Sequence, residues 1–86
     1  MCTDINERTA IAGSAKGPQG WMRVDTVNVS YDHPYHAPFD HSLNIDFMNE
    51  SAGGRDRVAL ELSAAAARAL IAAMERALAL GEAQHL

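Results

Sequence analysis

Three of the chain's four histidines lie within ten residues, and this segment carries the residue types best suited to chemistry. The segment, residues 32–41 (DHPYHAPFDH), is called here the histidine loop. Imidazole nitrogens are the commonest transition-metal ligands in proteins, and three of them form an open site suited to zinc. Two prolines fix their φ angles and lower the entropy cost of holding the loop. The loop therefore predicts a site for a transition metal, zinc first, with three ligands: His33, His36 and His41.

Carboxylates close to these histidines could complete such a site. Asp32 and Asp40 flank the histidines and could orient a ring from outside the ligand set. Glu7 shares the apolar parity of the first extended segment, and it could serve as a fourth ligand or as a general acid or base. The sequence assigns no residue a catalytic role.

A structural role for the histidine loop competes with metal binding. Histidines at strand ends can cap loop carbonyls, and the spacing His-x2-His-x4-His matches no established metal motif. Under this alternative each ring bonds its own neighbour and the three have no common target. Both interpretations stay open at the level of sequence.

Charge and cysteine content exclude several classes of function. The chain has 7 Lys+Arg against 11 Asp+Glu, a formal net charge of −4, and no basic run. Nucleic acid and anionic membrane surfaces are therefore not expected as partners. The one cysteine, Cys2, allows no internal disulfide and is typical of a reducing compartment. Without a signal-like start or a long uninterrupted apolar stretch, the sequence predicts a cytoplasmic protein.

The C-terminal third predicts the helix that must support the site. Ser63 is a good N-cap and Gly81 is placed as a C′ residue, which brackets a helix over residues 64–80. One face of this helix is apolar and is called here the helix stripe: Ala67, Leu70, Ile71, Met74 and Leu78. The stripe is expected to pack on a sheet. A second arc of alanines with Leu80 is either a contact surface or a solvated helical face.

Period-2 patterns predict two strands directly before the helix. Residues 43–47 and 58–62 alternate between apolar and polar side chains, and the segment SAGG between them predicts a hairpin turn. His41 continues the apolar parity of the first of these strands, and His33 continues that of Val27 and Val29. The two rings are therefore expected on the same side of the sheet.

Two further strands are predicted in the first half of the chain. Residues 21–31 switch apolar parity near Asp25, which indicates either a β-bulge there or a strand covered on both faces. Residues 3–12 resemble an edge strand, and the glycine-rich residues 13–20 are expected to form a mobile connection. The result is a single α+β domain over residues 1–86, an antiparallel four-stranded β-β-β-β-α meander with its C-terminal helix packed on the sheet.

The core of such a domain is predicted to be thin. Hydrophobic residues make up 48% of the chain, but alanine supplies much of that figure in the last third. A domain of this size buries only about 60% of the surface that its unfolded chain exposes. A homo-oligomer, most simply a dimer, is therefore expected.

Several motifs together resemble a family of short actinobacterial proteins known only as a domain of unknown function. They are MCT at the start, GSAKG-x-QGW, DHP-x-HAP-xx-H-x-LNIDF and RVALELSAAAARAL, and they run over nearly the whole chain. Glu7 matches a glutamate in the family's opening segment. The resemblance supports a site at the histidine loop and implies no mechanism.

Two functions from different classes follow. The first is a metal-binding domain, with metal-assisted chemistry if one coordination position stays open. The alternative is a non-catalytic dimeric accessory domain that binds a small molecule or a partner enzyme through the same loop. The sequence does not decide whether the protein is an enzyme.

Overall fold

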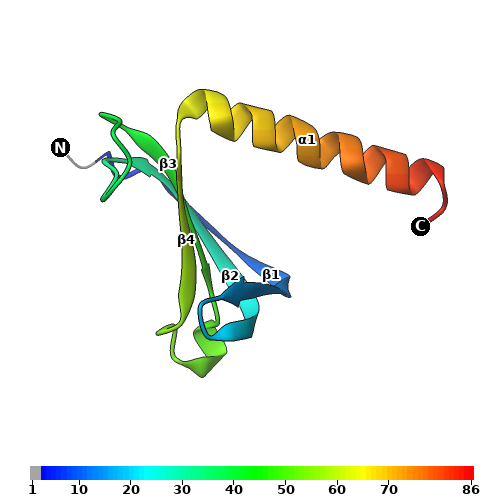
Figure 1. Cartoon of the computed structure of the whole chain (residues 1–86), viewed down its shortest axis with the longest axis horizontal. Coiled ribbons are helices and arrows are strands. Elements are labelled where there is room, and N and C mark those ends of the chain that lie inside the picture. Colours follow the sequence, from blue (N-terminus) through cyan, green and yellow to red (C-terminus); the bar gives the residue numbers. More distant parts are fainter. Residues whose placement is uncertain (1–2) are drawn as a thin grey trace.

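The chain forms one four-stranded sheet followed by a single long helix, as the sequence predicts. A computed structural model describes residues 3–86. The strands are antiparallel, in the order β1-β2-β3-β4. The elements are β1 (Asn6–Gly17), β2 (Gly20–Asp32), β3 (Ser42–Met48), the 3-10 helix η1 (Glu50–Ala52), β4 (Arg57–Leu62) and α1 (Ala64–Ala83) (Figure 1). The α+β meander is confirmed.

Strand register sorts the side chains of β2, β3 and β4 onto two faces. Val29 pairs with Ile45, which pairs with Leu60, and this pattern continues along the strands. Because side chains alternate across a strand, one face is apolar and the other polar. The apolar sheet face consists of Val27, Val29, Tyr31, Leu43, Ile45, Phe47, Val58, Leu60 and Leu62. The polar sheet face includes Asn28, Ser30, Asn44, Asp46, Ala59 and Glu61.

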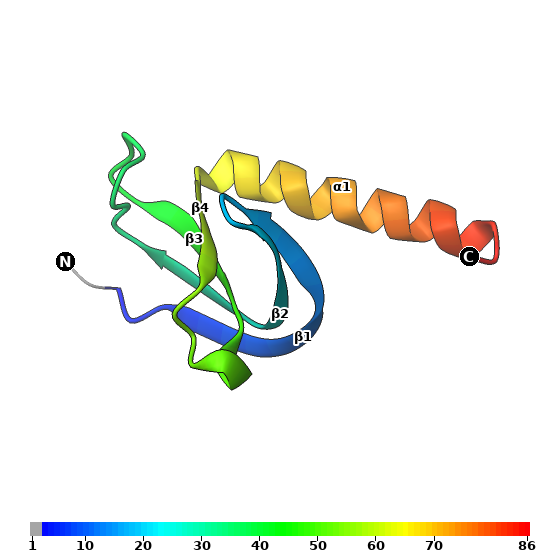
Figure 2. The same ribbon diagram turned by 60° about the horizontal axis from the view of Figure 1, so that its bottom comes forward.

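The glycine-rich segment is part of a hairpin, so its assignment as a mobile connection is wrong. β1 runs to Gly17, and a two-residue turn at Pro18 and Gln19 joins it to β2 at Gly20 (Figure 2). The small residues of this segment lack a hydrophobic period, but their backbone groups pair with β2. Gly20 has a φ of 105°, a conformation that suits glycine.

The irregularity predicted near Asp25 is present, and the extra residue lies on the partner strand. The register of β1 against β2 shifts between Ala10 and Gly13, which pair with Thr26 and Val24. Ile11 and Ala12 of β1 therefore lie opposite the single residue Asp25 of β2, which is the arrangement of a β-bulge.

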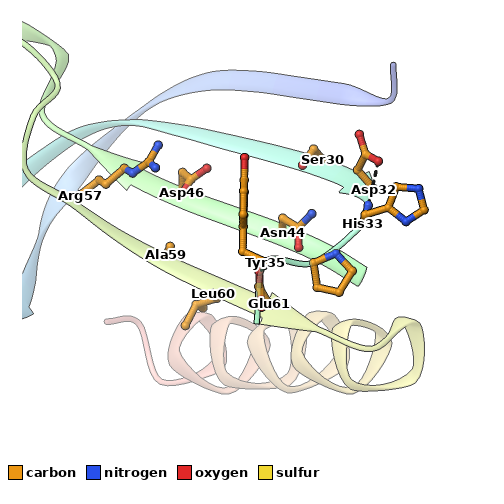
Figure 3. Close-up of a pocket in the computed structure, with 11 residues that line it drawn as sticks. Ser30, Asp32, His33, Tyr35, Asn44, Asp46, Arg57, Ala59, Leu60 and Glu61 are labelled. Atoms are coloured by element: carbon orange, nitrogen blue, oxygen red, sulfur yellow. Dashed lines mark hydrogen bonds between the residues drawn. The ribbon is translucent and has the colours of Figure 1, made fainter. Parts of the chain in front are cut away.

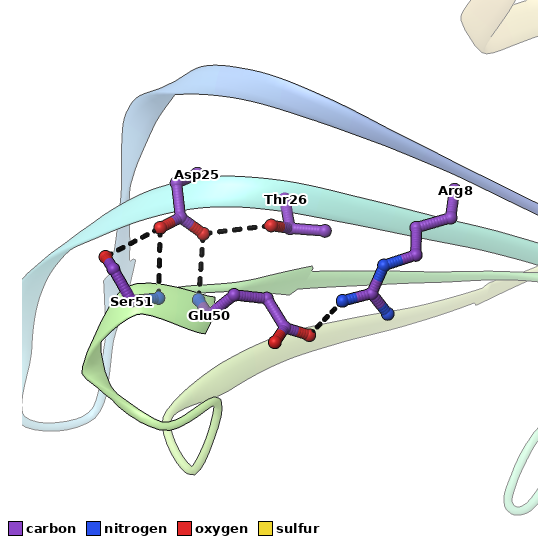
Figure 4. Close-up of polar contacts among 5 residues, drawn as sticks. All are labelled: Arg8, Asp25, Thr26, Glu50 and Ser51. Carbon is purple, nitrogen blue, oxygen red and sulfur yellow. Dashed lines mark hydrogen bonds and ion pairs between the residues drawn. The ribbon is translucent and has the colours of Figure 1, made fainter.

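Asp25 ties the bulged part of β2 to the turn between β3 and β4. Its carboxylate accepts hydrogen bonds from the backbone N–H of Glu50 at 2.8 Å and from the Ser51 hydroxyl at 2.8 Å (Figure 4). These bonds, led by the one from Ser51, lower the pKa of Asp25 well below its usual range. Arg8 of β1 forms an ion pair with Glu50 at the same place. The network fixes the end of the sheet remote from the histidine loop.

Helix α1 begins as predicted and ends later than predicted. The Ser63 hydroxyl accepts a hydrogen bond from the Ala66 N–H at 3.1 Å, which is the expected N-cap. Gly81 lies inside the helix, so its assignment as the C′ residue is wrong. His85, with a φ of 60°, takes the left-handed position instead, and Leu86 N–H bonds the Gly81 carbonyl at 3.0 Å.

The helix contacts the sheet only near its start. Ala67 is the one residue of α1 that is buried, and α1 meets β3 and β4 before extending away from them (Figure 1). The rest of the helix stripe is exposed, from 38% at Leu70 to 65% at Leu78. The prediction that the whole stripe packs on the chain's own sheet is therefore wrong beyond Ala67. Among the described residues, only Val24 and Ala67 are buried hydrophobic residues, which confirms the thin core.

No helix within residues 3–86 is long and apolar enough to cross a membrane.

Candidate functional site

The histidine loop connects the ends of β2 and β3 and is held over the polar sheet face by Glu61 of β4. The Glu61 carboxylate accepts hydrogen bonds from three successive backbone N–H groups, those of Tyr35, His36 and Ala37, the last two at 3.0 and 2.8 Å. These bonds, with that from Ala37 first, lower the pKa of Glu61, and the nearby His36 ring adds to the effect. Glu61 is therefore an ionised clamp on the loop backbone.

Acid should release this clamp, and this is our first prediction. The folded pKa of Glu61 lies below its ordinary value of 4.5, so the clamp stabilises the loop fully above that value and is lost as pH falls through the folded pKa. Amide exchange followed by NMR from pH 6 downward should show Tyr35, His36 and Ala37 losing protection together in this acid range. Each exchange rate is compared with the intrinsic rate of an unprotected amide at the same pH, and protection of the three amides that stays high after Glu61 has been protonated would contradict the clamp.

Two of the three predicted ligand histidines meet beside Tyr31. The rings of His33 and His41 are stacked with their centroids 4.8 Å apart. The ring of Tyr31 also stacks on that of His41, with the two centroids 5.9 Å apart. The strand parity of His33 and His41 therefore predicts their approach correctly. Nδ1 of His33 lies 2.9 Å from the carbonyl oxygen of Asp40; because a carbonyl only accepts, Nδ1 carries the proton in this contact.

The remaining members of the predicted site are placed separately. His36 is held through its backbone by Glu61. Glu7 is exposed in β1 and pairs with Val29 of β2, so its role as a fourth ligand or as a general acid or base stays a prediction. The Asp32 carboxylate accepts a hydrogen bond from the His33 backbone N–H at 2.7 Å, and Asp40 orients His33 through its backbone carbonyl.

No three side chains of His, Cys, Asp or Glu within residues 3–86 are grouped closely enough to hold a metal ion. Metal binding by the three histidines therefore stays a prediction. Cys2 lies outside the described residues.

A pocket of about 450 Å³ lies between the histidine loop and the polar sheet face. Its floor is formed by side chains of β2, β3 and β4, and Tyr35 of the loop stands over its middle (Figure 3). Asp32 and His33 lie at one end, and Asp46 and Arg57 at the other. The lining residues are Ser30, Asp32, His33, Pro34, Tyr35, Asn44, Asp46, Arg57, Ala59, Leu60 and Glu61.

Two features give the pocket its chemical character. Its carboxylates, Asp32, Asp46 and Glu61, outnumber its one permanent cation, Arg57. The Tyr35 ring is fully exposed to solvent.

A second pocket, of about 340 Å³, lies at the tip of the β1–β2 hairpin around Trp21.

Comparison with known families places the chain without assigning an activity. A model described as "Family of unknown function (DUF6295)" matches residues 1–86. The chain belongs to this family. The predicted membership of a family of unknown function is therefore confirmed for this DUF6295 domain. No curated protein and no solved structure matches the DUF6295 domain significantly.

Proposed function

We propose that this domain is a non-catalytic accessory domain that binds a small organic cation in the pocket under the histidine loop. The observation that carries the proposal is the Glu61 clamp, because it fixes three consecutive loop residues over the polar sheet face. A pocket whose walls are already held in place loses little conformational entropy when a ligand binds. Its volume of about 450 Å³ is within the usual range for small-molecule sites.

The charge of the lining supports a cationic ligand. Asp32 and Asp46 lie toward opposite ends of the pocket, so a ligand with two cationic groups could contact both (Figure 3). The exposed Tyr35 ring offers a face for a cation–π contact between them. Arg57 lies at the same end of the pocket as Asp46 and offsets part of its charge, but the three carboxylates of the lining still leave the pocket net negative.

The state of Glu61 supports binding over catalysis. A general acid or base at neutral pH needs a pKa near the working pH. Hydrogen bonds lower the pKa of Glu61 and so move it further from neutral pH. They also occupy both of its carboxylate oxygens. The carboxylate placed nearest the loop backbone is therefore a structural group.

Calorimetry with two probes of similar size tests the proposal. Agmatine, which carries a guanidinium and an amine, should bind, and glutarate, which carries two carboxylates, should not. D46N removes one charge from the lining without touching the loop, so it should weaken agmatine binding by about tenfold, or about 1.4 kcal/mol. S51A, at the far end of the sheet, is the matched control and should bind as the wild type. Equal binding of agmatine and glutarate would reject a cation site.

Metal binding is the second candidate, and the adjacency of His33 and His41 favours it. The two rings already lie at one place, and with Nδ1 of His33 protonated, its Nε2 is the atom that would ligate an ion. His36 would have to join them from the loop. Elemental analysis of protein purified without an affinity tag should then find one zinc per chain, lost in H33A and H41A and retained in H85A. Metal-free protein that does not take up added zinc would reject this candidate.

A further inference from the structure

Within residues 3–86, two apolar surfaces lack a covering layer. The apolar sheet face is half-buried at Val29 and Ile45 and exposed at Leu60. The helix stripe is exposed at every position after Ala67. An amphipathic helix and a one-sided sheet normally form stable domains by burying these surfaces against other elements.

The junction between β4 and α1 keeps these two surfaces apart within one chain. β4 ends at Leu62 and α1 starts at Ala64, so Ser63 is the only residue between them. Ser63 is itself engaged as the N-cap, through the bond from Ala66 N–H to its hydroxyl. A one-residue connection leaves little length for the helix to turn back, and α1 projects beyond the sheet (Figures 1 and 2).

The accessible surface of the chain is larger than that of a compact monomer of the same mass. Its accessible surface is 6658 Å², whereas a compact monomer of 9.3 kDa is expected to have about 5,000 Å². The radius of gyration is 14.5 Å, against about 12 Å for a compact domain of 86 residues. The excess of about 1,700 Å² per chain is about what each partner contributes to an obligate homodimer interface.

We propose that a second copy of this chain covers both surfaces, with α1 of each copy lying across the apolar sheet face of the other. Such a two-fold arrangement buries the helix stripe and the sheet face in one interface, and each contact occurs twice. Three of the four charged residues of α1, Arg68, Glu75 and Arg76, lie off the stripe and stay at the rim or in solvent, and the fourth, Glu82, lies in the last turn of the helix beyond Leu78. The cation pocket lies over the polar sheet face and shares only Leu60 with the apolar sheet face, so loss of the assembly and loss of ligand binding can be measured separately.

Solution mass and a matched pair of helix variants test the assembly. Multi-angle light scattering should give twice the 9.3 kDa chain mass for the wild type at micromolar concentration. Leu78 and Leu80 are equally exposed, at 65% and 63%, but only Leu78 belongs to the stripe. L78D should therefore shift the protein to monomer, whereas L80D should remain a dimer. A monomeric wild type, or loss of the dimer in L80D alone, would overturn the proposal.

Intermolecular NOEs test the arrangement without any variant. Protein labelled with ¹³C and ¹⁵N is mixed with unlabelled protein, and NOEs between the two copies are recorded. The proposal predicts contacts from the Met74 and Leu78 methyl groups of one copy to the Val29 and Ile45 methyl groups of the other. Intermolecular contacts confined to helix against helix would overturn it.

Discussion

A hundredfold dilution of the wild-type protein is expected to lower its melting temperature by about 8 °C. If two chains fold as one unit, unfolding releases two chains, and each tenfold dilution favours the unfolded state by about 1.4 kcal/mol per dimer. The entropy of unfolding for two chains of 86 residues then gives a shift of about 4 °C for each tenfold dilution. Thermal melts followed by far-UV circular dichroism, which reports the 20-residue helix α1, can measure this.

The control for this result is the monomeric variant. L78D should melt at the same temperature at every concentration, and at a lower temperature than the wild type. A wild-type melting temperature that does not change on dilution would contradict coupled folding and assembly, even if the protein associates at high concentration.

Replacing Glu61 with alanine is expected to have the largest effect on the site. The change removes the acceptor of three backbone bonds, so the amides of Tyr35, His36 and Ala37 should lose protection from exchange, and agmatine affinity should fall by tenfold or more. Glutamine keeps one carbonyl oxygen, which can still accept from His36 and Ala37, so E61Q should be intermediate. Equal agmatine affinity in the wild type, E61Q and E61A would show that the clamp does not contribute to ligand binding and would contradict this prediction.

Elements set by local patterns could be predicted from the sequence. The alternation around Ile45 predicts β3, and Ser63 followed by an alanine-rich segment predicts the start of α1. The parity of His33 and His41 is also local, and it predicts that the two rings meet.

The parts of the fold that depend on distant partners could not be predicted in the same way. The segment from Gly13 to Gly17 has no hydrophobic period, and it is a strand only because β2 lies beside it. Helical periodicity identifies the apolar stripe around Met74, but it does not say which surface covers the stripe. Gly81 satisfies the local signal for a helix end, yet the helix continues for two more residues and His85 takes the left-handed turn.

The central residue of the candidate site was missed for the same reason. In the sequence, Glu61 is one polar residue in the alternation of β4 and has no motif of its own. Its role comes from the loop 24 residues or more earlier, whose backbone donors converge on it. The available signal is weak: pairing places Glu61 beside Asn44, on the face over which the loop folds.

Mapping agmatine on the ¹H–¹⁵N spectrum of the wild-type domain tests the central claim most directly. If the pocket under the histidine loop is the binding site, shift changes should concentrate at the amides of Tyr35, His36, Asp46 and Glu61. The account predicts saturable changes at these positions that are absent when glutarate is added. Saturable changes confined to the second pocket around Trp21, or no saturable change anywhere, would contradict it.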